Sequence, residues 1–450
     1  MIRSALFAFA AAAALALPAA AQTVAVTNAR ILTAGPAGEI ANGTVVITNG
    51  RITAVGAGLP APAGARVIDA AGRVVTPGIV STGSDLGLNE VSAVDAQEDA
   101  TGSANRITAA FDVQYGLNPA STLLPVARLG GVTRAIVEPA RGGGGGGDGH
   151  NHGADAETQG VGGPSAQTNS GLFAGQAAAI HTAEAPDVLV RPRVAMVLDL
   201  GESGARRAGG SRGSAMVELL GILSDVRDFR DNRAAFERAE RREYGLSAAD
   251  LEALIPVVEG RMPVIVRVHR AADIRQVLRI AREQRLRIIL EDVEEAWMVA
   301  PEIAAAGVPV LVNPIVDLPY SFEALGASLE NAARLHAAGV TVVIRGDRAG
   351  HYARQTRWLA GNAVAHGMPP AAALQAITAN PARVFGLGEQ FGSLEVGREG
   401  DLVIWDGDPF EPITQPQHVF IRGVEQPLVT RQQQLRDRYR AQRPLPPGYH

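Results

Sequence analysis

Four side chains that could bind a metal ion or transfer a proton each follow a short apolar run of the sequence. They are Asp85, His269, Asp292 and Asp347. Imidazole and carboxylate groups are the ligands of divalent metals in hydrolytic sites, and a carboxylate can also accept a proton from water. If the apolar runs are parallel strands, their carboxyl ends meet at one mouth. We then expect all four side chains there, within roughly 15 Å of Asp347.

The charges in this region also allow a second interpretation, in which an arginine instead of a metal ion balances the carboxylates. Without a cation, Asp85, Asp292 and Asp347 would repel one another, and at least one would be protonated. Arg267 lies two residues before His269, and alternate residues of a strand share a face. Its guanidinium would offset the carboxylate charge, repel a cation and favour an anionic guest. Carboxylates alone also suit Mg²⁺ or Ca²⁺ better than Zn²⁺.

Each candidate also has a purely structural interpretation. Asp85 would cap the loop that begins at Leu86, and Asp347 would cap the helix that follows it. His269 would be a hydrogen-bonded histidine at the rim of the strands. These alternatives stay open at the level of sequence.

The middle of the chain alternates apolar runs with helical periods. Near-continuous apolar runs are typical of strands covered on both faces, and eight of them are the number that a closed parallel barrel needs. A doubly wound open sheet is the alternative fold. The runs cover residues 74–80, 132–137, 176–180, 194–198, 264–268, 288–290, 308–312 and 340–344.

The two ends of the chain have a different character from the middle. Residues 24–68 alternate apolar and polar positions in short runs, and Asn49-Gly50 between two of these runs is a strong hairpin signal. Residues 402–405 and 419–423 have the same character. The pattern predicts one small β-domain assembled from both ends, with two unrelated β-caps as the alternative.

Composition narrows the class of protein. The chain has 450 residues, 46% of them hydrophobic, and a formal net charge of −5, which gives no reason to expect a nucleic-acid partner. A basic start, an apolar run over 5–17 and an Ala-x-Ala exit at Ala21 predict a cleaved signal peptide rather than a stable membrane anchor. We therefore expect a periplasmic or secreted protein. The sequence contains no cysteine, so a thiolate nucleophile and disulfides are excluded.

Two stretches together resemble the amidohydrolase superfamily. One is Val75-Thr-Pro-Gly-Ile-Val80, and the other is Gly392-Ser-Leu-Glu-Val-Gly-Arg-Glu-Gly-Asp-Leu-Val-Ile-Trp-Asp-Gly-Asp-Pro-Phe410. Asn118–Arg128, Ala271–Ile274 and Thr378–Ala382 are similar to its imidazolonepropionase-like branch. The resemblance implies a distorted (β/α)₈ TIM-like barrel with a flanking β-sandwich. It also implies hydrolysis of carbon–nitrogen bonds by metal-activated water, with zinc as the usual cofactor.

The metal positions depart from the pattern that this resemblance implies. Gly83 and Asp85 stand where the first strand normally carries two histidines, and Arg267 stands at the likelier histidine position of the fifth. Asp292 replaces a histidine on the sixth strand. Asp347 matches the aspartate that binds metal and shuttles the proton. The expected metal set is therefore Asp85, His269, Asp292 and Asp347, with Asp347 catalytic and the metal weakly held or absent.

These observations predict the following organisation. We expect a signal peptide over 1–21, a barrel over 74–385 with a flexible glycine-rich insertion over 140–165, a β-sandwich domain from 22–73 and 386–425, and a tail over 426–450. The function hypothesis is an amidohydrolase-type hydrolase of non-peptide or dipeptide-like carbon–nitrogen bonds in a small-molecule substrate. The alternative is an inactive protein of this fold that binds a ligand or pairs with an active homologue; a homo-oligomer is also open.

Two further patterns favour loops over sites. His150 and His152 lie in the glycine run, where ordering the backbone around a metal would cost entropy. Gly209-Gly-Ser211-Arg-Gly213 has the letters of a serine elbow, but no buried strand precedes it.

Overall fold

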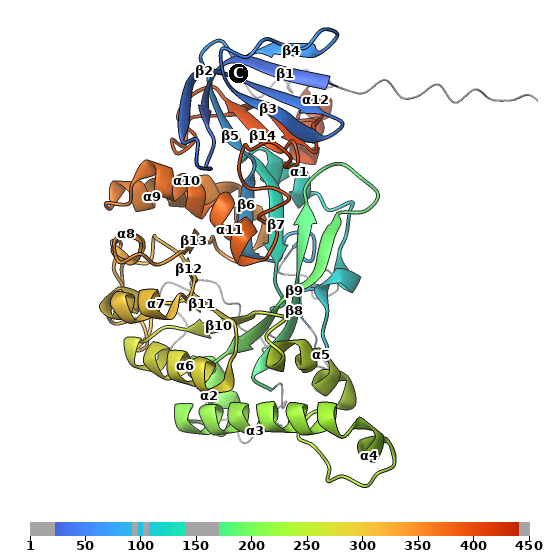
Figure 1. The fold of residues 1–450 in the computed structure, drawn as a ribbon, viewed down its shortest axis with the longest axis vertical. Helices are drawn as coiled ribbons and strands as arrows, with labels where there is room; N and C mark the ends of the chain where they lie inside the picture. The colour runs from blue at the N-terminus through green and yellow to red at the C-terminus, as the bar shows by residue number, and fades with distance from the viewer. Residues whose placement is uncertain (1–22, 92–97, 102–107, 141–170, 441–450) are drawn as a thin grey trace, which may run out of the picture.

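The computed structural model describes residues 23–91, 98–101, 108–140 and 171–440. The expected signal peptide, the glycine run with its two histidines, and the last ten residues lie outside these ranges. The described chain forms a β-domain at one end and a strand-and-helix barrel at the other (Figure 1). No helix in the described ranges is both long and apolar enough to cross a membrane.

The β-domain is built from both ends of the chain, as the sequence predicts. β5 pairs antiparallel with β14, from Leu402 opposite Pro77 to Trp405 opposite Val74. Asn49 and Gly50 both have positive φ, 52° and 80°, in the tight turn between β2 and β3. The strands are β1 (Thr23–Leu32), β2 (Glu39–Thr48), β3 (Arg51–Ala57), β4 (Arg66–Asp69), β5 (Val74–Pro77), β14 (Leu402–Trp405), β15 (Pro416–Ile421) and β16 (Val424–Glu425).

The barrel sheet contains a strand at each of the eight predicted apolar runs. The first run is divided: β5 belongs to the β-domain and β6 opens the barrel. The strands follow one another in sequence order around the sheet, from β6 to β13. They are β6 (Ile79–Ser84), β7 (Val132–Val137), β8 (Phe173–His181), β9 (Leu189–Asp199), β10 (Val264–Val268), β11 (Ile288–Asp292), β12 (Val310–Val312) and β13 (Val342–Ile344).

The expectation of eight parallel strands is wrong for one of them. β8 runs antiparallel to both of its neighbours, β7 and β9. Only residues 182–188 connect β8 to β9, and a parallel crossover needs a dozen or more residues, so a hairpin is the only connection that fits. The expected closure is also incomplete, because β6 and β13 are the two ends of the hydrogen-bonded ladder among the described residues.

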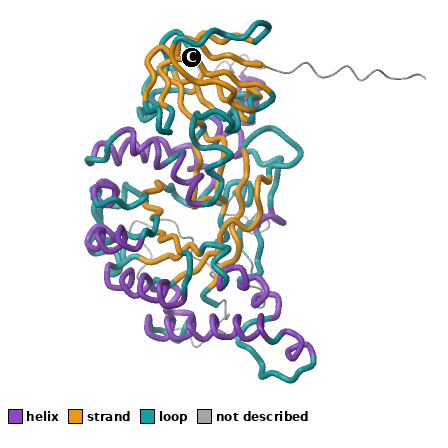
Figure 2. Tube along the Cα trace, viewed as in Figure 1, coloured by secondary structure: helices purple, strands orange, loops and turns teal. Residues whose placement is uncertain are grey.

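Helices cover the outside of the strands (Figure 2). α6 (Ala271–Gln284) is an amphipathic helix, and it buries Ile274, Val277 and Ile280. The other helices are α1 (Leu123–Arg128), α2 (Glu202–Arg207), α3 (Arg212–Asp231), α4 (Arg233–Glu237), α5 (Ala248–Val258), α7 (Ala300–Ala306), α8 (Asn331–Ala337), α9 (Thr356–Ala365), α10 (Pro370–Ala376), α11 (Ala379–Val384) and α12 (Arg431–Arg440), with 3₁₀ turns at η2 (Val113–Gly116), η3 (Ala296–Val299) and η4 (Gly350–Gln355).

The inside of the barrel is an apolar layer to which the strands contribute one or more side chains each. All of these side chains are buried in one cluster, which includes Val80, Ile136, Ala177, Val197, Ile265, Ile289, Leu311 and Val343. Because strand side chains alternate, the residue two positions further along points the same way. The layer above this apolar floor therefore faces the mouth formed by the carboxyl ends of the parallel strands.

Candidate functional site

Four charged side chains form the layer directly above the apolar floor. Glu138, Arg267, Glu291 and Arg345 each lie two residues beyond a floor residue, on or just after β7, β10, β11 and β13. The two glutamates are 0% exposed and the two arginines 8% exposed. Charged side chains are this deeply buried only when they are paired.

The pairing is continuous across the mouth. The Arg267 guanidinium lies between two carboxylates, with Nε 2.7 Å from Glu291 Oε2 and Nη2 3.3 Å from Glu138 Oε2. Arg345 Nη1 lies 3.1 Å from Glu291 Oε1 and 2.5 Å from Asp292 Oδ1. The five side chains thus alternate in charge: Glu138, Arg267, Glu291, Arg345 and Asp292. We call them the mouth network.

The two glutamates of the mouth network differ in the direction in which their pKa is shifted. Burial and then the neighbouring Glu291 raise the pKa of Glu138 to about 7, against the opposing charge of Arg267. Burial also pushes the pKa of Glu291 upward, but Arg345 and Arg267 outweigh it and lower that pKa to about 2. Glu291 is therefore the fixed negative charge between two guanidiniums, and Glu138 is the carboxyl that titrates.

Gly83, at the end of β6, contacts two side chains of this network. Its backbone N–H donates to Glu138 Oε1 at 3.2 Å. Its φ is +69°, and an added Cβ would lie 2.9 Å from Arg345 Nε and 3.2 Å from Glu291 Oε1. The Arg345 guanidinium therefore occupies the space that a side chain at position 83 would need.

Asp292 and Val293 have unusual backbone conformations. Their φ angles are 75° and 34°, where residues with a Cβ are rarely found. Burial raises the pKa of Asp292, although the Arg345 guanidinium opposes this effect. Strain of this kind persists where surrounding contacts impose it, and the ion pair of Asp292 with Arg345 is one such contact.

His269 lies near the network but has its own acidic partners. Its Nδ1 is 2.7 Å from Glu294 Oε2, and its Nε2 is 3.5 Å from Glu323 Oε1. Tyr320 donates its hydroxyl to Glu294 Oε1 at 2.8 Å. Burial lowers the pKa of His269, but Glu294 outweighs burial and raises it to about 10. At neutral pH the ring is an imidazolium, which has no lone pair for a metal.

Asp85 and Asp347 both lie next to Arg348: the backbone N–H of Asp85 donates to the Arg348 carbonyl oxygen at 2.9 Å, and Asp347 precedes Arg348 in the chain. Asp85 Oδ1 accepts from the backbone N–H of Gly350 at 2.6 Å, and burial raises its pKa to about 6. Asp347, just beyond β13, is half-buried, and Asn313 Nδ2 donates to its Oδ1 at 3.5 Å. Arg348 Nη1 donates to the backbone oxygen of Pro139 at 3.2 Å. Burial and then Arg267 lower the pKa of Arg348, which forms no ion pair with any carboxylate in the described ranges.

The four residues predicted to bind metal thus follow the ends of four strands but have separate partners. Asp292 pairs with Arg345, His269 with Glu294, Asp85 with the Gly350 amide, and Asp347 with Asn313. Among the described residues, no three His, Asp, Glu or Cys side chains are grouped so that they could hold a metal ion. The residues at the mouth do not fit a catalytic metal, because guanidiniums already lie against the carboxylates and an imidazolium replaces the neutral histidine.

Sequence reasoning missed three members of the mouth network. Glu138 follows the apolar run 132–137 directly, as His269 follows the run 264–268. Glu291 and Arg345 stand two residues beyond Ile289 and Val343, so strand alternation places them on the inward face. What the pattern does not reveal is which of these charges pair.

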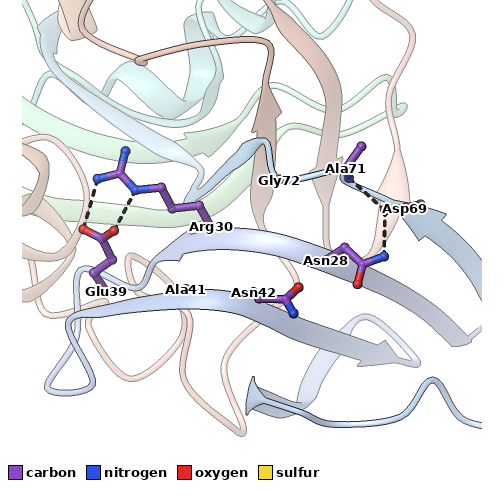
Figure 3. A pocket seen from close by; sticks show the side chains of 8 residues that line it. All are labelled: Asn28, Arg30, Glu39, Ala41, Asn42, Asp69, Ala71 and Gly72. Atoms are coloured by element: carbon purple, nitrogen blue, oxygen red, sulfur yellow. Dashed lines mark hydrogen bonds and ion pairs between the residues drawn. The ribbon is translucent and has the colours of Figure 1, made fainter.

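A shallow hollow on the β-domain carries no such arrangement (Figure 3). Its polar side chains pair with one another: Arg30 Nε lies 2.6 Å from Glu39 Oε1, and Asn28 Nδ2 donates to Asp69 Oδ1 at 3.0 Å. The hollow lies in the β-domain, which adjoins the start of β6, whereas the mouth lies at the end of β6.

Comparisons with known proteins agree with this architecture. A family model described as the amidohydrolase family matches residues 266–430. The chain is 27% identical over 415 residues to amidohydrolase tasK of Hapsidospora irregularis, covering 85% of this chain and 40% of that protein. It is 40% identical over 109 residues to an imidazolonepropionase of Aromatoleum aromaticum, covering 23% of this chain and 25% of that protein. The chain thus spans well under half the length of either relative.

A solved structure extends the likeness to the whole fold. The amidohydrolase from Thermotoga maritima MSB8 superposes with a TM-score of 0.75 at 22% identity, covering 89% of this chain and 99% of that one. The chain therefore has the amidohydrolase barrel fold with a β-domain made from both ends, and the amidohydrolase family model matches its residues 266–430.

Proposed function

We propose that this protein is an amidohydrolase-type hydrolase that acts on a carbon–nitrogen bond of a small amide or dipeptide-like molecule. The observation that carries the proposal is the position of Asp347. It follows β13 at the mouth of the barrel, it is only half-buried, and it lies inside the segment that matches the amidohydrolase family model. A carboxylate in this position can accept a proton from water.

The proposed chemistry uses groups of this chain. Asp347 takes one proton from water as the water oxygen bonds to the carbonyl carbon of the substrate. The carbon–nitrogen bond then breaks, and the same proton passes from Asp347 to the leaving nitrogen. Arg348, a guanidinium without an ion-pair partner in the described ranges, would hold the carboxylate or another anionic group of the substrate.

The test is turnover of a library of dipeptides, N-acyl amino acids and cyclic amides by the wild type and by Asp347→Asn. The substitution keeps the size of the side chain but removes its ability to take a proton, so we expect a loss of about 10²- to 10⁴-fold in kcat. Asp317→Asn is the control, because Asp317 is an exposed aspartate on the loop after β12. Equal turnover by wild type and Asp347→Asn would exclude Asp347 as the proton-transfer group.

A second candidate is favoured by the mouth network itself. Its buried ion pairs occupy the layer above the apolar floor. This favours a protein that binds a ligand, or pairs with an active homologue, without turnover. Such a protein would show ligand-dependent thermal stabilisation that Arg348→Gln removes, with no product formed by the wild type. Formation of a product by the wild type would support the hydrolase over the protein without turnover.

Two finer assignments belong to the same proposal. Within the amidohydrolases we place the chain in the imidazolonepropionase-like branch, supported by the partial match at 40% identity. We also propose export to the periplasm or medium, on the pattern of residues 1–21. N-terminal sequencing of protein from a cell that exports it should then begin at Gln22, and a start at Met1 would contradict export.

A further inference from the structure

Three buried or half-buried carboxylates converge on the mouth from two strands, and each needs a positive counter-charge. Glu138 follows β7, and Glu291 and Asp292 end β11. In water such charges are solvated, but at this depth an unpaired carboxylate costs several kcal/mol. The guanidiniums of Arg267 and Arg345 form the ion pairs with these carboxylates, and the charge of Arg348 also acts on Glu138 and Glu291.

We infer that Arg267 and Arg345 take the place of divalent cations at this mouth, as built-in positive charges that the carboxylates hold permanently. Each guanidinium bridges two carboxylates, as a bridging cation would. Arg267 joins Glu138 to Glu291, and Arg345 joins Glu291 to Asp292. A guanidinium carries fixed donors in a plane and stays charged at any physiological pH, which suits a permanent role.

Gly83 is the second observation that supports this inference. Its missing side chain leaves the volume that Arg345 fills, since a Cβ would come within 2.9 Å of Arg345 Nε. The backbone at Gly83 also joins the arrangement, through its N–H to Glu138. The glycine and the arginine therefore depend on each other: the space without a side chain at the end of β6 holds the guanidinium from the end of β13.

The role of the two guanidiniums can be tested without knowing any substrate. Removing both guanidiniums leaves Glu138, Glu291 and Asp292 around a newly opened space. Oxygen ligands of this kind bind hard divalent cations such as Mn²⁺ or Ca²⁺. A cation that binds only the folded state then raises the melting temperature.

The experiment compares the wild type with Arg267→Ala/Arg345→Ala, with and without 1 mM MnCl₂ or CaCl₂, by thermal unfolding. We expect the double variant to melt lower than the wild type and to gain about 3 °C or more from the metal, with the wild type unchanged. Arg357→Ala is the matched control. Arg357 is 1% exposed, but its guanidinium donates to backbone oxygens, those of Pro409 and Thr414 at 2.8 and 2.7 Å among them. It should lose stability and gain nothing from metal.

Two further variants keep the test decisive if the double variant does not fold. Arg345→Ala alone releases Asp292, whose side chain is 25% exposed and tolerates the change better, and it should show a smaller gain in the same direction. Adding Glu138→Gln and Glu291→Gln to the double variant should abolish the gain. A folded Arg345→Ala variant without any metal-dependent rise, or a wild type that gains as much as the variants, would overturn the inference.

Discussion

Strand β7 carries a buried charge at each end of the barrel, and the two charges serve different purposes. Arg134 and Glu138 lie four residues apart on the same face, with Ile136 of the apolar floor between them. Arg134 pairs with Asp401 and Glu399, both at 2.5 Å, and its guanidinium lies 4.8 Å from the ring centroid of Phe391. Glu138 belongs to the mouth network instead.

The two ends differ in where the partners come from and in how regular the backbone is. The partners of Arg134 lie just before β14, so this ion group fastens the β-domain to the barrel. The mouth network draws on the ends of four barrel strands, β7, β10, β11 and β13, and Asp292 at the end of β11 has a positive φ. Beside the network lies Arg348, without an ion pair in the described ranges. Buried arginine–carboxylate pairs thus form a structural clamp at one end and a charged, strained mouth at the other.

The largest expected effect on stability follows the removal of the buried guanidinium of Arg267 or of Arg134. Arg267→Met and Arg134→Met should each lower the free energy of unfolding by about 3–5 kcal/mol, because each leaves one buried carboxylate, Glu138 or Asp401, without its ion-pair partner. Glu138→Gln added to Arg267→Met should recover most of the loss at the mouth. Urea denaturation measures both. A loss below about 1 kcal/mol at the mouth, with the full loss at Arg134, would show that Arg267 does not neutralise the glutamates.

A glycine substitution separates backbone strain from crowding at the mouth. Gly83→Ala should cost about 2–4 kcal/mol, since it combines a positive φ with a contact against Arg345. Gly58→Ala is the control in the β-domain: its φ is +68° and nothing lies within 4 Å of its added Cβ, so it should cost only about 1–2 kcal/mol. Equal losses in the two variants would mean that Arg345 moves away freely.

The smallest expected effect is on the pH dependence of stability. The pKa of His269 is raised from 6.5 to about 10, so the stabilisation from its protonated ring is complete below pH 6.5 and is lost as the pH rises through about 10. The groups facing it are Glu294, Glu323, Tyr320 and Asp292. His269→Gln should therefore destabilise by about 1–2 kcal/mol at pH 6 and by progressively less toward pH 10. A deficit that grows with pH would contradict a protonated His269.

Much of this fold could be predicted from the sequence because burial leaves a local signature. The eight apolar runs and the two β-rich ends are each visible within a few residues. The direction of β8 is less visible, since an apolar run looks alike in both directions and only the short connection 182–188 reveals it. The site was harder to predict than the fold. Alternation shows that Glu138, Glu291 and Arg345 face inward, but which of them form ion pairs depends on how strands far apart in the chain are arranged.

The central claim is that guanidiniums hold the charge balance of the mouth in place of metal ions. Elemental analysis of the purified wild-type protein, prepared without added zinc and dialysed without chelator, tests it most directly. The account predicts well under about 0.1 equivalents of zinc, manganese or iron per chain. About one or two tightly held ions per chain, as a catalytic site of this fold would hold, would contradict it.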